Sequence, residues 1–162
     1  SSKGRGCMKK CVLILLTVVP VIVGYLVNVL IMVPLIGMAA FYLLPVCTTV
    51  FWIYLGRQYA RVWNPVAGVL LAHAVGAVSL LIYLWQFLLN TAETRNTALA
   101  GFSQMFSAAT PLYLLARLAR LVESEPNYAG MKTMVAMQVL ALVYMVIVFC
   151  IGIYLEKRKK PA

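Results

Sequence analysis

CVLILLTVVPVIVGYLVNVLIMVPLIGMAAFYLLPVCTTVFWIYLG, residues 11–56, runs for 46 residues without a charged side chain. One bilayer span needs roughly 20 apolar residues, because a helix rises about 1.5 Å per residue and the hydrocarbon core is about 30 Å thick. The stretch is therefore about twice as long as one span and has to fold back. Pro34 disfavours a helical conformation at Val33, so we expect the turn there, between helices at 11–33 and 35–56.

The rest of the chain continues this pattern, since 64% of all residues are hydrophobic and 11% are charged. Asn64-Pro65 is typical of a helix start, because Asn caps free amides and Pro suits the first helical position. Further spans are expected at 65–90, 97–122 and 133–155. The expected fold class is all-α: a polytopic integral membrane protein, multi-pass in the cell membrane, with a compact bundle of about five transmembrane helices.

The bundle, residues 11–156, is expected to be the single domain of the chain. Residues 1–10 are expected to form a cytoplasmic N-terminal segment, and residues 157–162 a basic C-terminal tail. Met8 followed by two lysines and an apolar run is typical of a natural start, so part of the sequence before it is expected to be vector-derived.

The segment 97–122 is the weakest span, because it contains several polar residues and Pro111. Cytoplasmic loops are enriched in Lys and Arg. Five spans would place nine of these residues on the cytoplasmic side and five outside. A segment that enters the membrane and returns would instead leave four spans and a ratio of ten to four. We favour five spans and keep four spans plus a re-entrant helix as the alternative.

Three tryptophans lie near the expected helix ends: Trp52, Trp63 and Trp85. Tryptophan is enriched at the two membrane–water interfaces. All three are therefore expected at the level of the lipid headgroups.

The net charge is +10, from 14 Lys and Arg against 4 acidic residues. The basic residues lie beside the spans, as anionic headgroups favour, so no nucleic-acid partner is expected. The expected anionic-lipid contacts are the arginines at the ends of two spans, Arg57, Arg61, Arg117 and Arg120. A partner subunit or a second copy of the chain is the other expected partner.

The spans contain no carboxylate, and the chain contains no Asp at all. Catalytic triads, carboxylate pairs and two-metal centres therefore lack their components. The single histidine, His73, has no partners for a zinc site. We accordingly expect no enzyme, no cofactor and no metal.

His73 is nevertheless the one ionisable residue well inside a span, where such residues are costly and tend to be used. It borders a face of small residues at every fourth position, which lets another helix approach closely. The expected packing residues on this face are Gly68, Ala72 and Gly76.

Several other polar residues fall inside the spans, although a lipid-facing surface should carry none of them. One interpretation is interhelical hydrogen bonding, worth about 0.6 kcal/mol per bond. The alternative is that they line one polar cavity between helices kinked at prolines such as Pro20. The candidate ligand-binding residues are Asn28, His73, Ser103, Gln104 and Ser107.

The leading functional hypothesis is a transport component that binds a neutral or anionic small molecule or a lipid in this cavity. The first alternative is a non-catalytic accessory or scaffold subunit of a membrane complex. The second alternative is a lipid-modifying membrane enzyme that uses His73 or a cytoplasmic arginine on a phosphate.

Overall fold

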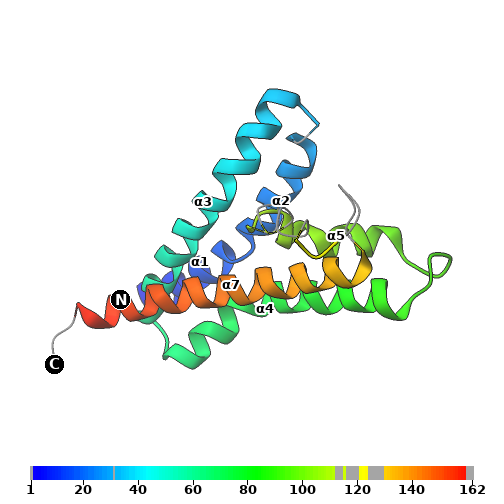
Figure 1. Cartoon of the computed structure of the whole chain (residues 1–162). Helices are drawn as coiled ribbons and strands as arrows, with labels where there is room; N and C mark the ends of the chain where they lie inside the picture. Colours follow the sequence, from blue (N-terminus) through cyan, green and yellow to red (C-terminus); the bar gives the residue numbers. More distant parts are fainter. Residues whose placement is uncertain (1, 31, 112–114, 116–120, 124–129, 160–162) are drawn as a thin grey trace.

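The computed structural model describes residues 2–30, 32–111, 115, 121–123 and 130–159, and in this part of the chain every regular element is a helix (Figure 1). Its elements are α1 (Ser2–Leu16), α2 (Val19–Leu30), α3 (Pro34–Ala60), α4 (Pro65–Leu84), the π-helical turn η1 (Trp85–Leu89), α5 (Thr97–Ala108) and α7 (Met131–Arg158). Four segments of the described chain are long and apolar enough to cross a membrane: Met8–Leu30, Pro34–Ala60, Pro65–Leu89 and Met131–Arg158. The expected all-α, multi-span class is confirmed.

Two helix starts follow directly from the local sequence. Val33 is extended, with φ −95° and ψ 113°, and Pro34 is the first residue of α3. The Asn64 side chain accepts a hydrogen bond of 2.8 Å from the amide of Ala67, and Pro65 opens α4. These starts set the two turns that reverse the chain at the beginning and the end of α3.

The first span is broken between α1 and α2 at Thr17 and Val18. Pro20 has no amide hydrogen and its ring crowds the carbonyl four residues earlier, so the regular ladder is interrupted. The amides of Thr17 and Val18 instead bond Ile14 and Leu15, three residues back, at 3.1 and 3.0 Å. The Thr17 hydroxyl also donates to the Ile14 carbonyl at 2.6 Å. The break therefore keeps these polar groups paired, as a bilayer requires.

The span expected at 97–122 is not one continuous helix, because α5 ends at Ala108 and a turn follows at residues 109–111. Twelve residues of helix extend about 18 Å, which is too short for a core of about 30 Å. Two local features contribute: Pro111 disfavours further helix, and the Thr110 hydroxyl bonds the Ser107 carbonyl at 2.6 Å. A contact with α3, described below, completes the turn. Residues 112–114 and 116–120 lie outside the described residues.

Helix α5 lies between α2 and α4 (Figure 1). On one side, a Cβ atom added to Gly24 of α2 would overlap the Met105 carbonyl. On the other side, the Ser79 hydroxyl of α4 donates to the Ser103 carbonyl at 2.5 Å. Beyond the end of α5, the Ala109 carbonyl accepts a bond of 2.6 Å from Thr48, near the middle of α3. The short helix therefore enters the bundle and ends inside it.

Helices α3 and α7 cross where Gly56 meets Gly152. A Cβ atom on Gly56 would overlap the Phe149 carbonyl, and one on Gly152 would overlap the Ile53 carbonyl. The absence of side chains thus lets the two backbones touch, which is the closest packing that helices reach. Aromatic side chains form the buried core beside this crossing, including Trp52, Tyr59, Phe106 and Phe149.

The start of α1 and the ends of α3 and α7 lie at one end of the bundle (Figure 1). The Tyr59 hydroxyl of α3 donates to the Leu13 carbonyl of α1 at 3.1 Å. Arg61, just after α3, pairs with Glu156 of α7 at 2.6 Å. Among the described residues, the first and the last of the four long apolar segments therefore meet at the same end of the bundle.

Candidate functional site

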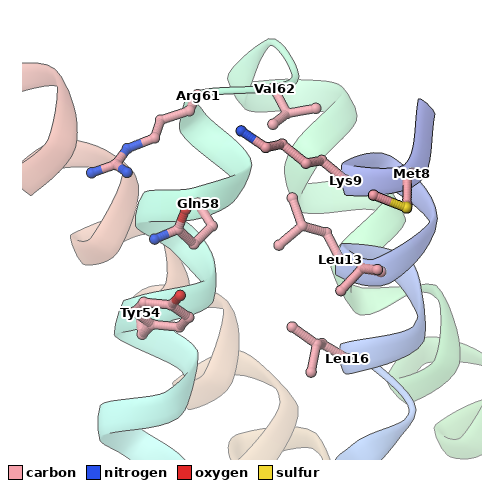
Figure 2. A pocket seen from close by; sticks show the side chains of 9 residues that line it. Met8, Lys9, Leu13, Leu16, Tyr54, Gln58, Arg61 and Val62 are labelled. Carbon is pink, nitrogen blue, oxygen red and sulfur yellow. The ribbon is translucent and has the colours of Figure 1, made fainter. Parts of the chain in front are cut away.

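The candidate site is a groove of about 450 Å³ between α1 and the end of α3 (Figure 2). Its lining residues are Met8, Lys9, Val12, Leu13, Leu16, Tyr54, Gln58, Arg61 and Val62. We call it the α1/α3 groove. Its volume falls within the range of small-molecule sites, which are mostly apolar with a few placed polar groups.

Helical spacing explains why these residues share the α1/α3 groove. On α1, Lys9, Leu13 and Leu16 are four and three residues apart, so they lie on one face. On α3, Tyr54 and Gln58 are four residues apart, and Arg61 follows three residues later. Leu13 and Leu16 give the α1 wall an apolar surface, and the charged side chains of Lys9 and Arg61 lie at one end, which we call the mouth. Gln58 and Tyr54 follow in turn along α3 away from the mouth (Figure 2).

The charges at the mouth are divided between an internal ion pair and Lys9. Arg61 Nε lies 2.6 Å from Glu156 Oε1, and Arg57 Nε lies 3.3 Å from Glu156 Oε2. The hydrogen bond and charge of Glu156 raise the pKa of Arg61 above its ordinary value. The Arg61 guanidinium points away from α1, whereas the Lys9 side chain reaches across toward α3 (Figure 2). No carboxylate among the described residues pairs with Lys9.

The pairing with Glu156 bears on the lipid contacts expected at Arg57 and Arg61. Glu156 occupies both Arg57 and Arg61, so an anionic lipid would have to compete with a carboxylate whose side chain is 9% exposed. Arg117 and Arg120 lie outside the described residues.

His73 lies in the aromatic core. Its ring stacks on Trp52 with centroids 5.1 Å apart and meets Phe149 edge-on at 5.0 Å. His73 Nδ1 donates to the Val69 carbonyl at 2.9 Å. His73 Nε2 and Trp52 Nε1 are buried without a hydrogen-bond partner in the described structure. The expectation of an interfacial Trp52 is wrong, because its side chain is fully buried.

The other candidate ligand-binding residues are spread over α2 and α5. The Ser103 and Ser107 hydroxyls donate to carbonyls of their own helix, at Ala100 (2.7 Å) and Gln104 (2.9 Å). Ser107 also lines a void of about 10 Å³, which holds at most one water. Gln104 is half-buried and Asn28 is exposed. None of the five candidates lines the α1/α3 groove.

The small residues expected to pack helices are buried on α4. Gly68 lies beside the side chains of Tyr59 and Trp63, and Ala72 is fully buried. A Cβ atom on Gly76 would come within 2.8 Å of the Phe106 ring. This face therefore receives aromatic side chains, whereas the backbone contacts occur at Gly24, Gly56 and Gly152.

Of the residues of the α1/α3 groove, the sequence singles out Arg61 alone, as an expected anionic-lipid contact. The available signal was the spacing of Tyr54, Gln58 and Arg61, which places three polar side chains on one face at the end of an apolar helix. Its partner wall could not be identified, because α1 and α3 are distant in sequence.

Within the described residues, no group of three His, Cys, Asp or Glu side chains is arranged to hold a metal ion. Comparison of the chain with protein-family models, curated proteins and solved structures finds no match.

Proposed function

We propose that this chain is a non-catalytic multi-pass membrane protein that binds an anionic amphiphile in the α1/α3 groove. The observation that carries the proposal is the groove itself. It joins an apolar wall on α1, and the Tyr54 and Gln58 side chains of α3, to an ammonium group that no described carboxylate neutralises.

The two parts of the groove favour the two parts of such a ligand. Val12, Leu13 and Leu16 offer hydrocarbon surface, and burial of apolar area contributes about 25 cal/mol per Å². Lys9 supplies a charged donor at the mouth, and charge-assisted hydrogen bonds to phosphate or carboxylate are stronger than neutral ones. Gln58 adds an amide that donates or accepts. A neutral amphiphile would gain only the apolar part.

The arrangement of the spans supports a location in the cell membrane with this end in the cytoplasm. Both ends of the described chain lie at the end that holds Lys9 and Arg61. This is the four-span topology, for which the count of Lys and Arg is ten to four. The positive-inside rule then places the mouth of the groove at the cytoplasmic leaflet, where anionic lipids are enriched.

These observations bear differently on the three functional hypotheses drawn from the sequence. The transport component is retained as a ligand-binding role, with the lipid or anionic ligand held at one end of the bundle. In the scaffold alternative, basic residues such as Arg117 and Arg120 would dock a partner protein, and both lie outside the described residues. The enzyme alternative used His73 or a cytoplasmic arginine. The His73 ring is enclosed by aromatic side chains, and Arg57 and Arg61 pair with Glu156.

The test is binding of hexadecyl phosphate to the full chain in phosphatidylcholine nanodiscs, followed by native mass spectrometry. Lys9→Gln should weaken binding at least about tenfold, since a direct hydrogen bond to a charged group contributes about 1.5–3 kcal/mol. Lys10→Gln is the matched control, because Lys10 is exposed and does not line the groove. Hexadecylphosphocholine, which has the same chain and no net charge, should bind both variants and the wild type equally.

A second variant tests the groove through its shape. Val12→Trp places a bulky ring on an exposed wall residue and should reduce binding of both probes. Equal losses for Lys9→Gln and Lys10→Gln, or full binding to Val12→Trp, would show that the anion binds elsewhere.

A further inference from the structure

A second cavity, of about 160 Å³, lies beside the break between α1 and α2. Its lining residues are Val19, Pro20, Val23, Leu44, Cys47, Thr48 and Phe51. The lining is apolar apart from Cys47 and Thr48, and the Thr48 hydroxyl is already engaged by the Ala109 carbonyl at 2.6 Å. The cavity therefore offers no strong polar group that is free to bind a ligand. Its lining favours a hydrocarbon chain.

The second cavity lies on the same side of α3 as the α1/α3 groove. Cys47 and Phe51 line the second cavity, whereas Tyr54, Gln58 and Arg61 line the α1/α3 groove. Successive members of this series are four or three residues apart, so all five lie along one face of α3. On the opposite wall, the groove ends at Leu16 of α1 and the second cavity begins at Val19 of α2. The two hollows therefore follow each other along one seam.

We infer that the ligand is a single-chain anionic lipid, with its headgroup at Lys9 and its chain running along α3 into the second cavity. This inference rests on the proposed function and names the ligand class. The face of α3 from Arg61 to Cys47 is about 21 Å long at 1.5 Å per residue. This exceeds half of a hydrocarbon core of about 30 Å, so the seam accommodates a long chain. The second cavity is too small for a bulky ring system, because typical small-molecule pockets start at about 300 Å³.

The source of this ligand is the bilayer. Two side chains that line the groove are strongly exposed, Val12 at 48% and Tyr54 at 52%, and Leu15 of α1 is 68% exposed. Two are aliphatic and one is an amphipathic tyrosine, so this surface suits contact with lipid. A lipid can enter sideways, whereas a short water-soluble anion would gain nothing from the second cavity.

The experiment compares hexadecyl phosphate with octyl phosphate on the same nanodisc-embedded variants. Val23→Trp fills the second cavity, and Ile22→Trp is its matched control, since Ile22 is 58% exposed and does not line it. Each probe is compared only between variants, so its partitioning into lipid cancels. Val23→Trp should weaken hexadecyl phosphate at least about fourfold, the equivalent of one buried methylene. Octyl phosphate binding should stay unchanged, which also shows that the variant is folded.

Cys47→Phe fills the cavity from the α3 wall. If Val23→Trp does not fold, Cys47→Phe should give the result expected for it. If both filled variants keep full affinity for hexadecyl phosphate while Lys9→Gln still loses it, the chain lies elsewhere and only this inference fails. If hexadecyl phosphate binding does not depend on Lys9, the proposed function fails and the inference fails with it. Equal losses for Ile22→Trp and Val23→Trp would also overturn the inference.

Discussion

At the scale of single residues, hydroxyl groups decide where α5 can end. The carbonyls at the end of a helix lack partners in that helix, and an unpaired carbonyl inside a bilayer is costly. Thr110 bonds the Ser107 carbonyl, and Thr48 of α3 bonds the Ala109 carbonyl, both at 2.6 Å. Thr48 and Thr110, two polar residues inside the expected spans, therefore close the end of α5.

Thr48→Val should destabilise the bundle by about 1 kcal/mol, because it leaves the buried Ala109 carbonyl without its donor. Thr48→Ser keeps the hydroxyl and should recover most of this loss. Reversible unfolding in mixed micelles, monitored by circular dichroism, gives the free energy of unfolding. Equal stability of the valine and serine variants would show that the bond contributes nothing.

Glu123 closes the start of α7, where Gly130 supplies no side-chain cap. Its carboxylate accepts from the Gly130 amide at 2.8 Å and from the Thr133 hydroxyl. The Thr133 hydrogen bond, and then the Gly130 amide, lower the pKa of Glu123 below its ordinary value of 4.5. A carboxylate with a lowered folded-state pKa stabilises above its unfolded pKa and loses this contribution as the pH falls through its folded pKa.

We therefore expect hydrogen-exchange protection of residues 130–134 to fall as the pH drops below 4.5. Glu123→Gln should lower this protection at pH 6 and remove its pH dependence. Glu93→Gln, in an exposed loop, is the control and should behave as the wild type. Protection factors have to be corrected for the intrinsic exchange rate at each pH. An unchanged pH profile in Glu123→Gln would contradict this role.

At the scale of elements, glycines at helix crossings set how closely the helices approach. The sequence drew attention to Gly68 and Gly76, which are buried against aromatic side chains. Tighter contacts occur at Gly24 and between Gly56 and Gly152. The last two glycines are 96 residues apart in sequence. The spacing of glycines within one helix carries no information about which glycine faces a partner, so this pair could not be predicted.

Gly56→Ala should destabilise the bundle by about 1–3 kcal/mol, because its Cβ would overlap the Phe149 carbonyl. The matched control is Gly101→Ala on α5, where a Cβ would meet no atom within 4 Å. Alanine has the higher helix propensity, so the control should be neutral or stabilised by up to about 1 kcal/mol. Unfolding in mixed micelles measures both. Equal effects of the two substitutions would mean that α3 and α7 do not cross in close contact.

The elements themselves were largely predictable. Pro34 and Asn64-Pro65 mark helix starts through rules that involve only neighbouring residues, and α3 and α4 begin where those rules indicate. The end of α5 at Ala108 was harder to predict from the sequence. Hydropathy over 97–122 allows a span, whereas the turn at 109–111 depends also on Thr48, a residue of another helix.

At the scale of the whole molecule, the pairing of Arg61 with Glu156 brings the ends of α3 and α7 together. Because α1 packs beside the end of α3, the described chain starts and finishes at one end of the bundle. The sequence favours five spans over four, although charge ratios of nine to five and ten to four differ little. In the described residues, four segments are long and apolar enough to cross.

Single cysteines in a cysteine-free background should report this topology. Lys10→Cys and Lys159→Cys should react with a membrane-impermeant maleimide from the same side of sealed vesicles, and Thr94→Cys only from the opposite side. Labelling of intact and inverted vesicles, read by gel shift, makes the comparison. Opposite accessibility of Lys10→Cys and Lys159→Cys would require an odd number of crossings and would exclude the four-span arrangement.

The sequence by itself determined that the helices are apolar enough for a bilayer, that the fold is all-α and where most helices start. Long uncharged runs and prolines act through hydropathy and local backbone geometry, which need no partner. Only the tertiary structure decided that α5 stops inside the bundle, that His73 and Trp52 stack in the core, and that α1 and α3 enclose a groove. These features depend on contacts between segments distant in the chain, where a side chain's partner is set by how helices pack and not by its neighbours in sequence.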